Sequence, residues 1–247
     1  MSVVVFLGPT LSLSEARGIA RCEFECRPPA RRGDIYRAVK HGARTIGLID
    51  GYFRSFPSVS HKEILWSLAA GCHILGSSSM GALRAAELSA FGMVGVGRIF
   101  QDFLQGKLSR DDEVAVEHAP PELGYFATSE ALVNMRYTLA MAIEGAHASN
   151  RFRTAFLKAA CEMRYPDRTY ERVFEGLEAA RELGQEDHES CRWVLRNKVN
   201  QKAEDATDLL QALSEPAPPR RRFDFEDTYH FAQFRAFEDN PLIRHLA

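Results

Sequence analysis

The sequence predicts an α/β fold: a Rossmann-like parallel sheet with flanking helices in the N-terminal half, followed by an all-helical C-terminal region. Two observations support this prediction. Up to about residue 118, short apolar runs alternate with helical patterns, which is typical of βαβ units. Beyond Pro121, the apolar residues recur with helical spacing. We therefore expect a core domain over residues 1–120, a helical domain over 121–215, and a linker with an aromatic segment over 216–247.

Three apolar runs predict the strands of the sheet, at residues 3–7, 45–49 and 72–75. Gly8-Pro9 stops the first run and Asp50-Gly51 stops the second, because these residue types interrupt regular structure. Ligands of parallel sheets bind at the carboxyl ends of the strands, so we expect the functional site at this edge.

Helices are expected between and after these strands, at residues 12–20, 35–41, 61–70 and 82–90. Asp34 can cap the second of them. Ser60 and Glu63 form a capping box, in which each side chain accepts a hydrogen bond from the other residue's free backbone N–H.

The second half contains four amphipathic segments, at residues 129–144, 151–163, 167–183 and 197–213. The run from Pro216 to Arg222 is expected to be a linker or an exposed extended segment. The last 25 residues contain six aromatic residues, namely Phe223, Phe225, Tyr229, Phe231, Phe234 and Phe237. So many aromatic side chains do not suit a free tail, so we expect this segment to pack back on the helices or to dock on a partner.

Composition excludes several classes of function. The chain has 31 Lys+Arg and 33 Asp+Glu and a formal net charge of -2, so it has no overall electrostatic reason to bind nucleic acid. Its apolar runs fall short of the roughly 20 residues that a membrane-spanning helix needs. Residues 3–7 are also too short for the core of a signal peptide. We therefore expect a cytoplasmic protein with no membrane or nucleic-acid partner.

Neither the cysteines nor the acidic residues predict a metal site. Cys22 and Cys26 form a single C-x3-C pair, without a second pair at zinc-binding spacing. Reduced thiols are expected, with a redox or persulfide role of this pair as the alternative. Three adjacent acids stand at residues 111–113, but side chains of neighbouring strand residues point to opposite faces.

The segment from Gly76 to Leu88, GSSSMGALRAAEL, carries the strongest functional signal. A strand runs into a turn of small residues, and the turn opens a helix. Around Ser79, the pattern Ser-x-Ser-x-Gly is a variant of the nucleophile elbow. Such a turn presents a hydroxyl at a helix N-terminus, where free N–H groups stabilise an oxyanion. Three consecutive serines leave the nucleophile open, and a helix capped by its serines is the structural alternative.

A serine nucleophile needs a base. His61 and Lys62 begin the helix after the second strand, at the sheet edge where the serine turn is expected. Asp50, at the tip of that strand, could orient a base. His118 closes a strand-like run at residues 112–118 and is a further candidate.

Arg84 and Glu87 lie three residues apart on the helix that follows the serine turn, so they can form an ion pair. Arg84 is close enough to the turn to help hold a carboxylate or thiocarboxylate. A solvated or structural ion pair is the alternative for this helix face.

Motifs across the first half of the chain resemble those of the TfuA-like family. They are Gly8-Pro9-Thr10, Pro28 to Ile35, Leu48-Ile49-Asp50-Gly51 followed by Phe53, His61 to Leu65, Gly76 to Leu88, Phe91-Gly92-Met93, and Asp111 to Val116 with His118. The resemblance covers roughly residues 3–118. Members of the family often carry Ala at the position of Ser77 and Trp at the position of Ser60.

The resemblance implies a partner role beside a YcaO enzyme in the formation of backbone thioamides, in ribosomally made peptides or on a protein glycine. YcaO enzymes activate a peptide amide with ATP, and sulfide then replaces the oxygen. TfuA-like proteins are tied to the supply of sulfur. Because the YcaO partner uses the ATP, no cofactor is expected in this chain.

Together, the resemblance and the serine turn lead to a hydrolase hypothesis. Ser79 would cleave the C-terminal thiocarboxylate of a sulfur-carrier protein, assisted by His61, Lys62 and Asp50, and sulfide would pass to the YcaO site. The residues assigned to substrate binding are Ser78, Met80, Gly81, Arg84, Glu87 and His118. The alternative is a non-catalytic adaptor that docks YcaO, peptide or sulfur carrier. A third hypothesis is a serine hydrolase or amidase that acts on a small molecule.

Overall fold

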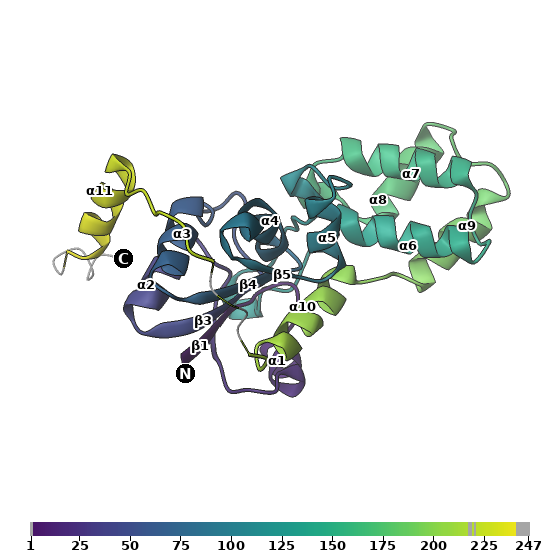
Figure 1. The fold of residues 1–247 in the computed structure, drawn as a ribbon. Helices are drawn as coiled ribbons and strands as arrows, with labels where there is room; N and C mark the ends of the chain where they lie inside the picture. The colour runs from purple at the N-terminus through teal and green to yellow at the C-terminus, as the bar shows by residue number, and fades with distance from the viewer. Residues whose placement is uncertain (1, 217–218, 220, 241–247) are drawn as a thin grey trace.

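A computed structural model describes residues 2–216, 219 and 221–240 (Figure 1). Its strands are β1 (Ser2–Phe6), β2 (Glu25–Arg27), β3 (Ala43–Leu48), β4 (His73–Ser77) and β5 (Val94–Val96). They form a parallel sheet of order β2-β1-β3-β4-β5. In this doubly wound order the chain changes direction between β1 and β3, which opens a crevice at their carboxyl ends. The predicted parallel sheet with flanking helices is confirmed.

The sequence analysis missed β2 and β5, which have three residues each. Both lie at the edges of the sheet, where they pair only with β1 and β4, respectively. Such short strands carry too few alternating residues to be recognised without their neighbours.

Helices α1 (Leu13–Ile19), α2 (Asp34–Lys40), α3 (His61–Ala69), α4 (Met80–Leu88) and α5 (Arg98–Leu104) alternate with these strands. The capping box of Ser60 and Glu63 is present at the start of α3. Asp34, in contrast, is the first residue of α2, and Gly33 is its N-cap.

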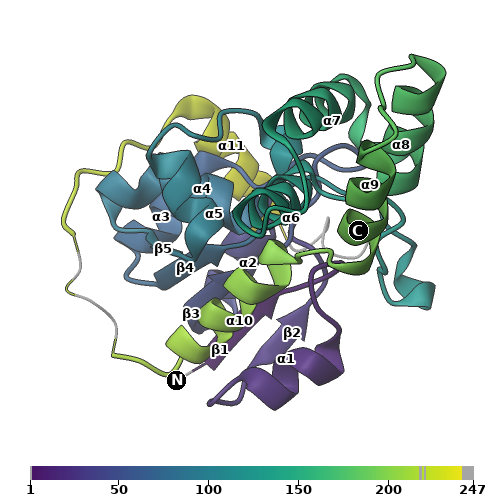
Figure 2. The ribbon, with the colours of Figure 1, turned by 90° about the vertical axis from the view of Figure 1, so that its right-hand side faces the viewer.

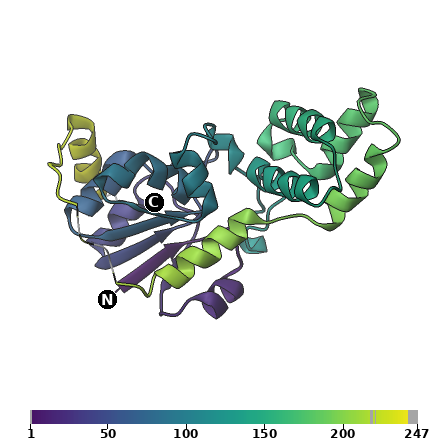
Figure 3. The ribbon, with the colours of Figure 1, turned by 45° about the vertical axis from the view of Figure 1, so that its right-hand side comes forward.

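Helices cover both faces of the sheet (Figure 3). On one face, Ile46 and Ile74 of the sheet belong to a core cluster with Ile64 of α3 and Ala85 of α4. The other face packs against α1 and against α10 (Gln201–Ala212), which returns from the far end of the helical region. The helix predicted at residues 197–213 therefore belongs to the second half of the sequence but packs on the sheet of the first half.

Helices from the second half of the chain form a separate bundle beside the sheet (Figures 1 and 2). They are α6 (Leu132–Glu144), α7 (Asn150–Glu162), α8 (Tyr170–Ala179) and α9 (Asp187–Arg196), and they share one apolar core. The helical character of this region is confirmed, although α9 was not predicted. Within the part of the chain that the structure describes, no helix is both long and apolar enough to cross a membrane.

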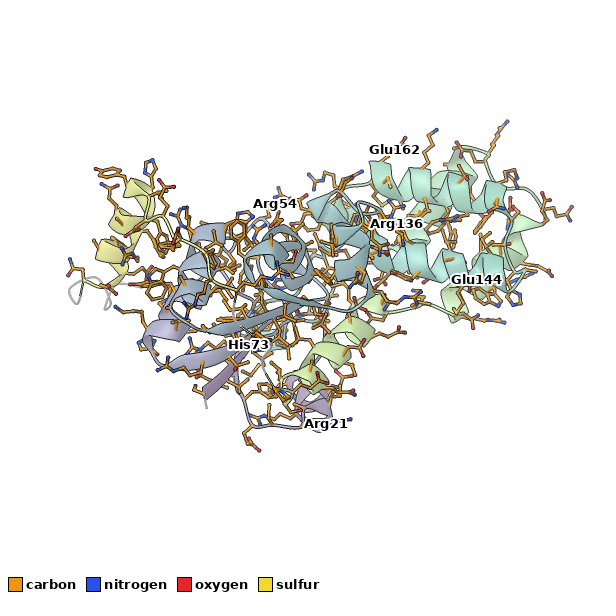
Figure 4. The ribbon with its side chains drawn as sticks, in the orientation of Figure 1. Arg21, Arg54, His73, Arg136, Glu144 and Glu162 are labelled. Atoms are coloured by element: carbon orange, nitrogen blue, oxygen red, sulfur yellow. The ribbon has the colours of Figure 1, made fainter. Side chains whose placement is uncertain are left out.

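The predicted strand-like run at residues 112–118 is wrong. Asp111–Glu113 form a short 3-10 helix instead. The Asp112 carboxylate pairs with Arg168, whose side chain is fully buried. Glu113 accepts two hydrogen bonds from Arg136 of α6, which Figure 4 labels. These ion pairs hold residues 111–113 against the helical bundle, and they engage two of the three adjacent acidic side chains.

The aromatic C-terminal segment packs back on the sheet layer. Its helix, α11 (Tyr229–Glu238), places Phe231 and Phe234 edge-on against the ring of Tyr36 in α2. Arg37 forms an ion pair with Glu238 at 2.6 Å. The linker residues Ala217, Pro218 and Arg220 and the segment 241–247 lie outside the described residues.

Close backbone contact between α4 and the sheet gives a first prediction. A Cβ atom on Gly81 would lie 1.7 Å from the backbone oxygen of Leu48, which cannot move without breaking β3. Gly81→Ala is therefore expected to lower the free energy of unfolding by about 3 kcal/mol, or the melting temperature by roughly 6–12 °C. Thermal unfolding followed by circular dichroism measures this.

The matched control is Gly18→Ala, in the exposed part of α1, where a Cβ would meet no atom within 4 Å. This change is expected to leave stability unchanged or to raise it by up to about 1 kcal/mol, because alanine is the better helix former. Equal melting temperatures for the two variants would contradict the packing argument.

Candidate active site

The three serines of the turn after β4 use their hydroxyl groups differently, although all three are buried. Ser77 donates to a backbone carbonyl of α10 at 2.7 Å. Ser78 lies 3.5 Å from the hydroxyl of Thr10, and Ser79 donates to the carbonyl of Val114 at 3.3 Å. The Ser77 hydroxyl thus serves to dock α10 on the sheet, which leaves Ser78 and Ser79 as candidates for chemistry.

The backbone of this turn is sharply bent. Ser78 has a φ of 64°, in the left-handed region that residues other than glycine seldom adopt. Ser79 is the N-cap of α4, but its hydroxyl caps no N–H group of the described helix. The structural alternative of a helix capped by this serine is therefore not what the structure shows. A strained strand–turn–helix junction of this kind is the defining feature of a nucleophile elbow.

Asp50 organises the crevice between β1 and β3. Its buried carboxylate accepts hydrogen bonds from the backbone N–H groups of Gly8 and Thr10, at 2.9 and 3.1 Å, and from the Thr10 hydroxyl at 2.7 Å. The loop after β1 is thereby closed over the end of β3, and Thr10 is held beside Ser78. Asp50 lies at the predicted edge of the sheet, and the side chain that hydrogen-bonds to its carboxylate is that of Thr10.

A pocket of about 60 Å³ opens at this edge of the sheet, and Asp50, Ser79 and His118 all line it. Its other walls include Pro9, Pro29, Tyr52, Phe53, Arg54, Val116 and Tyr165. The volume suits a few water-sized groups, such as the tip of a flexible chain, and not a drug-sized ligand.

His118 is the predicted histidine that the fold brings to the pocket. Its Nδ1 lies 2.9 Å from the carbonyl oxygen of Ala119, and the rings of Tyr52 and Tyr125 lie beside it. If Nδ1 donates to that carbonyl, the neutral ring carries its lone pair on Nε2. The imidazole can then exchange a proton at Nε2.

His61 and Lys62, the predicted bases, lie on the outer surface of the sheet layer and do not line the pocket. His61 Nε2 is 2.8 Å from the carboxylate of Glu87, and its side chain is 47% exposed. Lys62 donates to the backbone oxygen of Glu226. Since Glu87 is eight residues beyond Ser79, its partner His61 meets α4 about 12 Å along the helix from the turn.

Arg84 donates to the same Glu87 oxygen as His61, at 2.7 Å. Burial alone would raise the pKa of Glu87, but the hydrogen bonds from His61 and Arg84 outweigh it and lower this pKa. Met80 and Arg84 line a groove of about 500 Å³ that shares the Phe53 side chain with the pocket. Gly81 donates its N–H to a carbonyl at the end of β3, so it holds the helix and not a ligand.

Lys202 lies near this site and was not predicted from the sequence. It lies in the first turn of α10, is 3% exposed, and donates from Nζ to the carbonyl of Val114 at 2.9 Å. Burial lowers the pKa of this amine, and the nearby carboxylates of Asp50 and Glu130 oppose that shift. One signal could have found it: Lys202 is four residues before the apolar stripe of α10 that begins at Ala206, so it shares the buried face.

A family model described as TfuA-like protein matches residues 50–169, from Asp50 through the serine turn and His118 to the end of α7 and beyond. A search of the curated proteins finds no match to the chain. The matched segment holds most of the pocket residues and also the first helices of the bundle, which the motif resemblance did not cover. Over residues 50–169, the chain is similar to the TfuA-like protein family.

Proposed function

We propose that this protein is a hydrolase that releases sulfide from the C-terminal thiocarboxylate of a sulfur-carrier protein, for use by a YcaO enzyme in forming backbone thioamides. The observation that supports the chemistry is the pocket that Ser79, Asp50 and His118 line together. The match of residues 50–169 to the TfuA-like family supports the choice of substrate.

The shape of the site suits the end of a protein tail. The pocket has room for a terminal thiocarboxylate, and the groove along α4 continues from it past Phe53. Arg54, labelled in Figure 4, is exposed in the pocket wall. Arg84 lines the groove. These cations would attract an anionic chain end, and the N-terminus of α4 adds a positive partial charge at Ser79.

In the proposed reaction, Ser79 Oγ bonds to the carbonyl carbon of the thiocarboxylate. The C–S bond then breaks, and hydrosulfide (HS⁻), which carries the serine proton, leaves while an ester remains on Ser79. Water cleaves the ester, which returns the serine hydroxyl and releases a C-terminal carboxylate and one proton. The net reaction consumes one water per sulfide and needs no other co-reactant. His118 can supply or accept a proton at the pocket during these steps.

Ser79→Ala tests the nucleophile. Sulfide release from a thiocarboxylated sulfur-carrier protein, measured without YcaO, is expected to fall at least about a thousandfold, because the acyl-serine can no longer form. The matched control is Ser77→Ala, whose hydroxyl serves only to dock α10. Unchanged release by the Ser79→Ala protein would contradict the assignment.

The adaptor function is the second candidate, and the exposure of α11 favours it. Tyr229 and Phe237 are 72% and 56% exposed, although the same helix buries Phe231. An aromatic pair of this kind is typical of a protein interface. If α11 is the docking element, its exposed face contacts the YcaO partner.

Replacing Tyr229 and Phe237 together by alanine is then expected to weaken binding to the YcaO partner at least about tenfold, because aromatic anchors dominate interface energies. Isothermal titration calorimetry measures the affinity. Leu104→Ala, an exposed apolar residue on α5, is the control. An unchanged affinity of the double variant would argue against docking through α11.

A further inference from the structure

The amine of Lys202 is buried beside the serine turn, although it lies beyond the residues that match the family model. Its Nζ and the hydroxyl of Ser79 both donate to one atom, the carbonyl oxygen of Val114, at 2.9 and 3.3 Å. Both groups are therefore held at one carbonyl oxygen. A proton transfer between them requires the Ser79 hydroxyl to turn from this carbonyl toward the amine by rotation about the Cβ–Oγ bond.

The charges that face Lys202 come from two other segments of the chain. Asp50, after β3, and Glu130, before α6, both act on the amine. The Asp50 carboxylate is already bonded to the loop after β1, and Glu130 accepts from Asn134 at 2.9 Å. Burial raises the pKa of Glu130 and lowers that of Lys202, so burial moves both groups toward their neutral forms.

We propose that Lys202 is the base that accepts the Ser79 proton, so that the two residues form a serine–lysine pair. This inference rests on the proposed function for its substrate, but it concerns a residue of the chain that neither the motifs nor the family match includes. Ser–Lys pairs serve the same role as Ser–His pairs on other folds.

The proton balance of this pair is complete. A neutral amine keeps one N–H on the Val114 carbonyl while its lone pair accepts the Ser79 hydroxyl proton, as the Oγ–carbon bond forms. The resulting ammonium returns that proton to the sulfide as the C–S bond breaks. In the second half of the reaction, the amine takes a proton from water and returns it to Ser79 Oγ.

The other candidate bases are placed less well. His61 and Lys62 are held at the surface by Glu87 and by the backbone of Glu226. His118 lines the pocket, but its Nδ1 lies at hydrogen-bond distance from the carbonyl oxygen of Ala119. Lys202, in contrast, shares a hydrogen-bond acceptor with the Ser79 hydroxyl itself.

The test measures the reactivity of Ser79 separately from the natural substrate. Phenylmethanesulfonyl fluoride is added to the full-length protein, and sulfonylation of Ser79 is followed by mass spectrometry from pH 6 to pH 10. The wild-type rate is expected to rise as the amine loses its proton. Lys202→Met is expected to react about a hundredfold more slowly and to lose this pH dependence.

Two further variants distinguish a Lys202 that acts as a base from a Lys202 whose positive charge only stabilises the fold. Lys202→Arg keeps the positive charge between Asp50 and Glu130 but supplies no base, so it is expected not to restore labelling. Lys107→Met, an exposed lysine outside the pocket, is expected to react as the wild type does. Thermal unfolding shows which variants are folded, and the wild-type pH profile tests the proposal even if Lys202→Met does not fold.

A folded Lys202→Met protein that is labelled at the wild-type rate would overturn the pair and leave the proposed hydrolysis to another base. A wild-type labelling rate that does not change with pH would overturn it as well. Lysine-dependent labelling without sulfide release from a thiocarboxylated carrier would support the pair and refute the proposed substrate. The two proposals therefore fail separately.

Discussion

Burial of the second face of the sheet by α10 is the constraint on which the rest of this structure depends. Leu209 and Leu210 of α10 cover Val5 and Leu75. At Gly47, a Cβ would lie 3.0 Å from the Leu209 side chain, so the glycine permits the close approach. Because α10 comes after the helical bundle in the chain, this one contact also returns the chain to the sheet.

The same helix shapes the site through its polar residues. The carboxylate of Asp205 accepts the N–H of Ile99 at the start of α5, and its backbone carbonyl accepts the hydroxyl of Ser77. One turn earlier, Lys202 reaches the Val114 carbonyl that also binds Ser79. The packing of α10 on the sheet thus gives the Ser77 hydroxyl a structural role and places the Lys202 amine near Ser79.

The serine turn itself is held from the opposite side. Gly81 brings α4 against the end of β3, and the left-handed conformation of Ser78 costs about 1–3 kcal/mol that the surrounding contacts must offset. Asp50 closes the loop after β1 over this turn with three hydrogen bonds. A site built on strained backbone between rigid elements keeps its hydroxyl groups in place without help from a ligand.

The sequence by itself determined the features that arise from neighbouring residues: β1, β3 and β4, the capping box of Ser60, the serine turn, and Asp50 at a strand tip. Hydrophobic period and capping are local properties, so a pattern can show them. Only the tertiary structure decided that residues 112–118 form the end of a 3-10 helix and a loop, and that α10 covers the sheet. It also decided that His61 faces Glu87 and that Lys202 lies beside the serine turn. These outcomes depend on contacts between residues far apart in the chain, and an amphipathic pattern shows that a face is buried but not which partner buries it.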